Sequence, residues 1–492
     1  MSSLQAAAAA SYPERRWLAL FILLLAGFMN LIDTTIVNVA LPRLQAVFGA
    51  TSSQIEWVAA AYVLAFALGL LPFGRLGDTV GRKRMFLVGI AAFTLFSGLC
   101  GLAPDMRTLI AARVLQGISG AMMMPQVLAI VSVIFPPQER GTAFAFFGLS
   151  AGLASVAGPL TGGFLIDADL FGLDWRPIFL VNLPFGVLAI VAGYLLIPAM
   201  PGNRDLRHDP FGVLLAVLAI FLLIFPLVEG RSFGWPWWAF AMIAAAVAAM
   251  AAFYLWEAGR ARRGETQLLP LSLMNNGGFM LGSAMSTIFF SGIPGFFLAF
   301  AIFLQTGFGF TPLESGLTTM PFPLGVLLAT AVSGRLRGRF PRGRIAAGGL
   351  LLLVGMALVS WQVGKVVDVV DHWAFVPPLL LCGFGMGIAI SSLFQTVLAN
   401  VGHVDAGAGS GALQSFQQIG GAFGIAIVGE IFFSSLHSDM QAGMAPHAAF
   451  VGSLADALVY NLVAFAIVVL MVFLLKAPPP QAGRPAAVPV EA

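Results

Sequence analysis

An aspartate inside a long apolar stretch is the residue that most strongly suggests chemistry. Residues 17–42 are apolar over about one membrane thickness, yet they contain Asp33. A membrane-spanning helix needs about 20 apolar residues, and a charge near its centre costs between ~2.5 and more than ~10 kcal/mol. Asp33 lies about 12 Å from one end of the stretch at ~1.5 Å per residue. We expect this acid to face a partner or a hydrated cavity, because its side chain is too short to reach the interface, which is the alternative.

An arginine in another apolar stretch lies at nearly the same depth. Arg113 is followed three residues later by Gln116, so both side chains share one helix face. Opposite charges at matched depth predict an ion pair or a shared hydrated cavity. Asp33 and Arg113 are therefore candidates for proton coupling. A static structural ion pair is the alternative.

Uncharged polar residues near these charges are candidates for a substrate cavity. Asn30 shares a helix face with Asp33, and Gln414 and Gln417 share a face of a later apolar stretch. Together with Asp33 and Gln116, these residues form the predicted cavity lining. Most of the numerous phenylalanines are expected to face lipid, so none of them is a candidate for cargo binding.

The composition places the chain in a membrane. Of its 492 residues, 59% are hydrophobic and only 10% are charged, and the mean hydropathy is +0.93. Soluble domains are about one-quarter charged. We therefore expect an all-α integral membrane protein. Cys100 and Cys382 both lie in apolar stretches, so neither a disulfide framework nor a zinc site is predicted.

Apolar windows long enough to cross a membrane recur along the chain, and fourteen spans are predicted. The windows are 17–41, 54–74, 85–103, 107–134, 142–165, 177–197, 210–228, 235–256, 275–305, 313–334, 344–362, 374–398, 407–433 and 455–475. The middle pair depends on aromatic belts, because Trp238 and Trp256 would lie about 27 Å apart on a helix, close to the hydrocarbon thickness.

Internal repeats divide the windows into two sets of six. Gly74-Arg75-Leu76 recurs as Gly334-Arg335-Leu336, and Gly162-Gly163 recurs as Gly420-Gly421. Such spacing fits parallel repeats with two helices inserted between them, which is a transporter architecture. The predicted organisation is a disordered tail at 1–14, a six-helix bundle at 15–200, a connector with two extra helices at 201–265, a second six-helix bundle at 266–476 and a disordered tail at 477–492.

The basic residues report the orientation of the chain. With fourteen spans and a cytoplasmic N-terminus, nineteen arginines and lysines fall on the inner side, five on the outer side, and Arg113 remains inside the membrane. The positive-inside rule therefore predicts that both termini are cytoplasmic. The net charge of +3 is then a topology signal, and nucleic acid is not an expected partner.

The loop between the second and third windows combines glycine, acid and base. Gly74 and Gly81 permit close helix approach and a sharp turn, whereas Asp78, Arg82 and Lys83 can pair with each other and with helix ends. We predict a gate on the cytoplasmic face. A loop that serves only the positive-inside rule is the alternative.

A further motif is expected to shape the fifth window. Gly158, Pro159, Gly162 and Gly163 make a helix that packs closely and departs from ideal geometry, since Pro159 removes a backbone hydrogen bond.

These motifs together resemble those of a known transporter family. The stretch from Gly74 to Lys83 resembles the signature loop of the major facilitator superfamily. Residues 31–42, Leu-Ile-Asp-Thr-Thr-Ile-Val-Asn-Val-Ala-Leu-Pro, resemble the first-helix motif of its fourteen-span drug:proton antiporters, the EmrB/QacA type. The resemblance implies the major facilitator fold, with two six-helix bundles and two extra central helices.

Three more stretches extend the resemblance. Arg113-Val114-Leu115-Gln116-Gly117 resembles the fourth-helix motif linked to proton coupling, and Gly158-Pro159-Leu160-Thr161-Gly162-Gly163 resembles the fifth-helix antiporter motif. Trp175-Arg176 and Asn182-Leu183-Pro184 match the usual start of the sixth span. Two positions depart from the pattern: Thr79 replaces a usually basic residue, and Ala154 stands where the antiporter motif often has glycine.

The expected function is secondary transport. The sequence contains no catalytic constellation and no phosphate-binding loop, so neither an enzyme nor direct use of ATP is predicted, and no cofactor or metal is expected. We expect a proton-driven exporter of amphipathic, cationic small molecules in the inner cell membrane, with a periplasmic adaptor left open as a partner. The alternatives are an exporter or symporter of an endogenous metabolite, and a membrane sensor or scaffold.

Overall fold

The computed structural model is helical throughout the part of the chain that it describes. It describes residues 15–50, 52–203, 205–206, 209–231, 233–335 and 340–475, and no strand occurs within these ranges. The all-α prediction is confirmed. The predicted tails at 1–14 and 477–492 lie outside the described residues, and the repeat at Gly334-Arg335-Leu336 runs into undescribed residues at 336.

The helices follow the predicted windows closely. The first half contains α2 (Arg15–Phe48), α3 (Ser52–Val80), α4 (Arg82–Gly101), α5 (Met106–Ile134), α6 (Pro137–Asp167), α7 (Pro177–Leu180) and α8 (Asn182–Leu196). The connector contains α9 (Pro210–Glu229) and α10 (Trp237–Arg262). The second half contains α11 (Leu271–Met274), α12 (Gly277–Ser291), α13 (Pro294–Ile302), α14 (Pro312–Thr319), α15 (Pro321–Arg335), α16 (Pro341–Val363), α17 (Val376–Leu398), α18 (Ala406–Gln441) and α19 (Pro446–Met471).

Thirteen helical segments in the described part are long and apolar enough to cross a membrane. The predicted window at 313–334 is not among them, and it is divided between α14 and α15. The division falls at Met320, directly before Pro321, whose backbone has no N–H to continue the helix.

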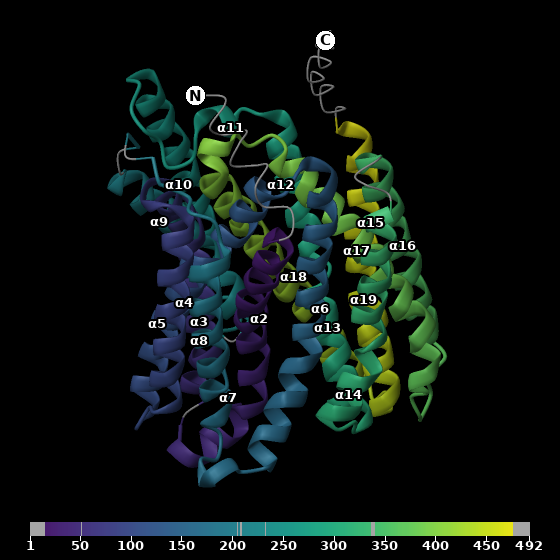
Figure 1. Cartoon of the computed structure of the whole chain (residues 1–492). Coiled ribbons are helices and arrows are strands. Elements are labelled where there is room, and N and C mark those ends of the chain that lie inside the picture. The colour runs from purple at the N-terminus through teal and green to yellow at the C-terminus, as the bar shows by residue number, and fades with distance from the viewer. Residues whose placement is uncertain are drawn as a thin grey trace, which may run out of the picture.

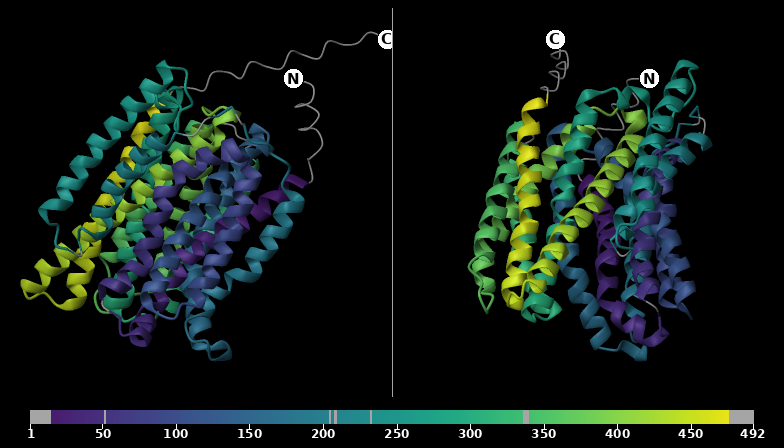
Figure 2. Two further views of the ribbon diagram at one scale, coloured as in Figure 1. Left: turned by 90° about the vertical axis from the view of Figure 1, so that its left-hand side faces the viewer. Right: turned by 180° about the vertical axis from the view of Figure 1, so that it is seen from behind.

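The helices form one elongated bundle in which the two halves pack side by side (Figure 1). Helices α3, α4 and α5 pack together in the first half, and α15, α16, α17 and α19 pack together in the second. The halves meet where α18 packs on α3 and α5, and where α15 and α17 pack on α6. Helix α2 begins and α19 ends at the same end of the bundle (Figure 2).

The connector pair packs beside the junction of the two halves. Ile220 and Ile224 of α9 form an apolar cluster with Ala67 of α3 and with Ile419 and Ala422 of α18. Helix α10 packs mainly on α9. The connector is therefore in contact with both halves rather than a free linker.

The expectation that the phenylalanines face lipid does not hold for all of them. Among those whose side chains are described, nineteen are buried and eight are exposed. Phe144 of α6 and Phe394 of α17 are both almost fully buried and touch each other across the two halves, with ring centroids 5.9 Å apart. The residue type alone does not distinguish a lipid-facing ring from one that fills space between helices.

In each half, a glycine that faces a threonine allows two helices to pack closely. A Cβ at Gly158 of α6 would overlap the side chain of Thr35 in α2, and a Cβ at Gly420 of α18 would overlap the backbone of Thr287 in α12. At each crossing the threonine hydroxyl donates to a carbonyl of the other helix, Thr35 to Ala154 O and Thr287 to Phe416 O, both at 3.1 Å. The structure therefore equates Gly158 with Gly420, whereas the repeat in the sequence paired Gly162 with Gly420.

We expect Gly158→Ala to destabilise the protein by about 1 to 3 kcal/mol, because the added methyl group overpacks the α2–α6 crossing. Gly163→Ala is the matched control, since a Cβ there meets no atom within 4 Å. The measurement is thermal unfolding of both purified variants in detergent. Equal melting temperatures for the two variants would contradict the tight crossing.

Candidate functional site

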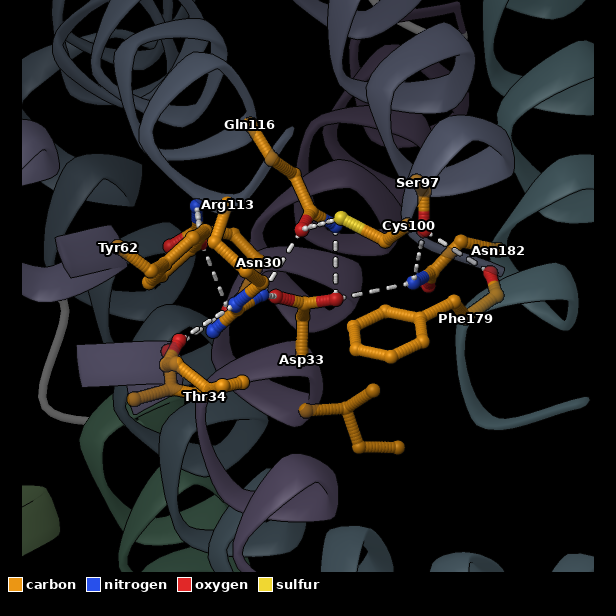
Figure 3. Close-up of polar contacts among 12 residues, drawn as sticks. Asn30, Asp33, Thr34, Tyr62, Ser97, Cys100, Arg113, Gln116, Phe179 and Asn182 are labelled. Carbon is orange, nitrogen blue, oxygen red and sulfur yellow. Dashed lines mark hydrogen bonds and ion pairs between the residues drawn. The ribbon is translucent and has the colours of Figure 1, made fainter. Parts of the chain in front are cut away.

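The two charges predicted to pair are in direct contact. Asp33 of α2 is fully buried and Arg113 of α5 is 1% exposed. Arg113 Nη1 donates to Asp33 Oδ2, and Gln116 Nε2 donates to Asp33 Oδ1 at 2.8 Å (Figure 3). The helix face shared by Arg113 and Gln116 thus supplies both donors. The ionised carboxylate is neutralised and hydrogen-bonded on both oxygens.

A third donor to the carboxylate comes from α8. Asn182 Nδ2 lies 3.3 Å from Asp33 Oδ1 and 3.0 Å from Ser97 Oγ, and Ser97 in turn donates to Phe179 O at 2.9 Å. Sequence reasoning placed Asn182 only in a motif at the start of the sixth span, and it missed Ser97. The carboxylate is thus held by α5 and α8, while α4 holds the amide of Asn182.

The guanidinium group of Arg113 has partners besides Asp33. Its Nε donates to Val58 O at 3.0 Å and its Nη1 to Gln116 Oε1 at 2.8 Å. The ring of Tyr62 lies 4.2 Å from the guanidinium carbon, within cation–π range. Arg113 therefore keeps two neutral oxygen acceptors and an aromatic face in addition to its bond with Asp33.

Asn30 lies beside this network rather than on the carboxylate. Its Nδ2 donates to the Tyr62 hydroxyl at 2.6 Å, and Tyr62 packs on Arg113. We define Asn30, Asp33, Tyr62, Arg113, Gln116 and Asn182 as the acid network. All six residues belong to the first half of the chain.

Gln414, one of the two glutamines of α18 predicted to line the cavity, lies at the junction of the halves. Gln414 of α18 donates from Nε2 to Met124 O of α5 at 2.9 Å, and Gln417 lies one turn further along α18 and is 8% exposed. Within the described residues, no hydrogen bond joins either glutamine to Asp33. Three of the five predicted cavity residues therefore belong to the acid network, whereas Gln414 contacts α5 and Gln417 lies beside it on α18.

The predicted gate loop also makes a set of charged contacts. Asp78, at the last turn of α3, accepts from Arg82 Nη2 at 2.8 Å and from Gly407 N and Ala408 N at 2.9 Å each. The two amides belong to the first turn of α18, where the helix dipole favours an anion. The Asp78 carboxylate thus joins the first half to the second.

A second ion pair lies next to Asp78. Arg75 Nη1 is 2.6 Å from Asp405 Oδ1, directly before α18. We define the latch as Arg75, Asp78, Arg82, Asp405 and the first backbone amides of α18. The end of the bundle where these groups lie is called the latch end.

The remaining residues of the gate loop have structural roles at the same end. Gly81 adopts φ 109° and is the single residue between α3 and α4, a conformation that favours glycine. A Cβ at Gly74 would lie 2.5 Å from Gly407 O, so α3 and α18 are in close contact there. Lys83 donates to Tyr194 O at 2.7 Å within the first half.

The fifth-window motif lies partly against α2. Gly158 and Gly162 both approach that helix, near Thr35 and Ile36. Pro159 lies inside α6, and a Cβ at Gly163 would meet no atom within 4 Å. Two of the four motif residues therefore form the crossing itself.

Comparison with known proteins finds a family model and relatives that match most of the chain. The family model described as Major Facilitator Superfamily matches residues 23–225 and 209–425. The chain is 41% identical over 431 residues to the "Probable actinorhodin transporter" of Streptomyces coelicolor, covering 87% of this chain and 75% of that protein. It is 34% identical over 436 residues to the "Puromycin resistance protein pur8" of Streptomyces alboniger, covering 87% and 84%.

Among solved structures, the human organic anion transporter MFSD10 (TETRAN) has a similar fold. The TM-score is 0.62 at 17% sequence identity, and the match covers 93% of this chain and 100% of that one.

We expect Asp78→Asn to open the latch end more often, because the neutral amide loses charged hydrogen bonds worth about 1.5 to 3 kcal/mol each. The readout is the labelling rate of Ser410→Cys by a water-soluble maleimide, with Cys100 and Cys382 replaced. Ser410 is fully buried on α18, and its labelling should rise about tenfold or more. Asp205→Asn removes an exposed acid and should leave the rate unchanged; equal rates in all variants would contradict the latch.

Proposed function

This chain belongs to the Major Facilitator Superfamily, a family of membrane transporters rather than enzymes, and we propose that it is a proton-driven exporter of amphipathic small molecules. Export is supported by relatives named for antibiotic transport and resistance. Alternating access between the two halves is the mechanism that the fold supports.

The buried pair of Asp33 and Arg113 is the observation that carries the proton-driven part of the proposal. A buried acid that exchanges a proton must tolerate both charge states. When Asp33 takes up a proton, Arg113 loses its counter-charge but keeps Val58 O, Gln116 Oε1 and the Tyr62 ring as partners. The acid network therefore offers the guanidinium a second arrangement, which a permanently locked ion pair would lack.

The acid network connects to the junction of the halves through its helices. Asp33 is two residues from Thr35, which bonds to α6, and α6 packs on α15 and α17 of the second half. Arg113 lies on α5, whose Met124 carbonyl accepts from Gln414 of α18. Two sets of contacts thus connect the surroundings of Asp33 to helices that must separate during alternating access, so a change in its charge can affect both.

The latch supplies the gate in this proposal. When it is closed, Asp78 holds the start of α18 against α3, and cargo has no path between these helices at the latch end. We infer that the latch end is cytoplasmic and that the protein lies in the inner cell membrane, because arginines and lysines gather at that end of the predicted topology. The membrane potential then contributes about 2.3 kcal/mol per charge moved through 100 mV.

The cationic cargo expected from the sequence depends on a free Asp33. In the described state the carboxylate is bound to Arg113, so it would attract a cation only after that pair has separated. Protons and small molecules are the proposed partners, and the charge of the cargo has to be inferred from groups at the junction of the halves.

We expect Asp33→Asn to abolish proton-coupled transport, because the amide cannot exchange a proton in the physiological range. Purified protein in proteoliposomes is supplied in turn with an anionic and a cationic aromatic probe, and both probe uptake and proton release are followed under an imposed pH gradient. Proton release should fall at least about tenfold. Asp205→Asn is the control with an exposed acid. Wild-type proton release by Asp33→Asn would place the coupling site elsewhere.

We also expect the α9–α10 loop to face outside. A thiol at Phe233, which is 57% exposed, should react with an impermeant reagent added to intact cells when Cys100 and Cys382 are replaced. A thiol at the exposed Asp205 should react only after permeabilisation. The reverse pattern would overturn the orientation and the cytoplasmic latch.

A further inference from the structure

A continuous strip of side chains lies between α6 of the first half and α17 of the second. At its inner part, Phe394 of α17 contacts Phe144 and Phe147 of α6 with ring centroids 5.9 and 6.0 Å apart, and Phe290 of α12 stacks on it at 6.2 Å. Among the described residues, the two contacts with α6 are the ring contacts that join the six-helix halves directly. Alternating access must separate them.

At the latch end of the bundle, the strip terminates at a buried cation, Arg344. Arg344, in the first turn of α16, is 4% exposed. Its Nη2 donates to Ser391 Oγ of α17 at 3.0 Å, whereas its Nε and Nη1 have no hydrogen-bond partner among the described residues. A Cβ at Gly141 of α6 would lie 3.6 Å from Nη1, so the first half covers the guanidinium.

The cation and the rings belong to one surface. Gly141 and Phe144 are three residues apart on α6, and Ser391 and Phe394 are three residues apart on α17, so each pair shares a helix face. The covering of Arg344 by Gly141 and the contact of Phe144 with Phe394 are therefore successive contacts along one crossing. We define Arg344, Ser391, Phe394, Phe144, Phe147 and Phe290 as the interface strip.

Arg344 differs from the other buried arginines in the described part of the chain. Arg113 is paired with Asp33, and Arg75 is paired with Asp405. Within the described part of the chain, no carboxylate lies within 4 Å of Arg344, and the Ser391 hydroxyl is the one hydrogen-bond partner of its side chain. Burying a guanidinium without a counter-charge is strongly unfavourable, so a structural role alone does not account for it.

The fold does not require a cation at this position. Helix α4 begins at Arg82 and α16 at Pro341, and Gly89 of α4 packs on α5 as Gly348 of α16 packs on α17. This correspondence places Met85 of the first half opposite Arg344 of the second. Met85 is also buried, at 5% exposed. An apolar side chain therefore fills the equivalent site in the first half.

We propose that the interface strip binds an aromatic anion as cargo, with Arg344 taking the carboxylate or another oxyanion and the phenylalanines taking the rings. The proposal rests on the exporter function proposed above and specifies its cargo. When the latch end opens, α6 withdraws from α17 and uncovers Arg344 toward the cytoplasm. The free charge that cargo then meets is positive, whereas Asp33 remains neutralised by Arg113 inside the first half.

The test uses two probes with the same ring and opposite charge, 9-anthracenecarboxylate and 9-anthracenylmethylammonium. Purified full-length protein is reconstituted in proteoliposomes, and gradient-driven transport of each probe is measured with and without a protonophore. Wild type should transport the carboxylate at least tenfold faster than the ammonium. Arg344→Met, which installs the residue found at position 85, should reduce carboxylate transport at least tenfold.

Matched variants separate binding from folding. Arg344→Lys keeps the charge and should retain most carboxylate transport, and Phe394→Leu should weaken transport of both probes. Arg84→Gln removes an exposed arginine near the same end and should change neither rate. The melting temperature of Arg344→Met should equal or exceed that of wild type, because the variant removes an unpaired buried charge. A large fall in melting temperature would assign Arg344 to the fold instead.

The outcomes distinguish the cargo site from the exporter function. Preference for the ammonium probe, or unchanged carboxylate transport in Arg344→Met, would overturn the interface strip while gradient-driven export stands. If carboxylate transport depends on Arg344 but is unchanged by the protonophore, the cargo site is supported and the proposal that protons drive transport is overturned. Transport of neither probe by wild type would overturn the assignment of aromatic anions.

Discussion

The neutralisation of one acid in the membrane interior is the constraint on which the first half depends. An unpaired carboxylate at that depth is costly, and Arg113, Gln116 and Asn182 supply the charge and donors that Asp33 needs. These donors come from α5 and α8, so three helices including α2 must meet at one point. Gly120 of α5 permits the approach to α2, because a Cβ there would lie 2.4 Å from Asn30 Nδ2.

The latch uses the same chemistry with a different consequence. Asp78 is also a nearly buried carboxylate held by an arginine and by N–H donors, but two of those donors are the first amides of α18. The acid network lies within one half and is preserved when the halves separate. The latch spans both halves, so its charged hydrogen bonds, each worth about 1.5 to 3 kcal/mol, must break when that end opens.

The sequence predicted what depth and helix periodicity determine. Asp33 and Arg113 were paired by matched depth, and Gln116 was placed by its spacing from Arg113. The glycine repeat paired Gly162 with Gly420, whereas the equivalent crossings lie at Gly158 and Gly420. The sequence of a single helix does not determine its rotation about its axis or which helices it packs against. Ser97 could therefore not be identified as a partner of Asn182. The partner of Gln414 is a backbone carbonyl, and because every residue has one, the sequence could not identify this partner. Arg344 was already explained by the positive-inside rule, and that hid its burial.

The two halves share a backbone plan but carry different charges, and this asymmetry has a mechanistic implication. Aligning the crossings at Thr35 and Thr287 places Asp33 opposite Met285, which is fully buried and apolar. Aligning α4 with α16 places Met85 opposite Arg344. Under the functions proposed above, the first half carries the proton and the second half carries the charge that holds cargo. Coupling must then pass through the α5–α18 and α6–α17 contacts, because within the described residues no hydrogen bond or ion pair connects the acid network directly to Arg344.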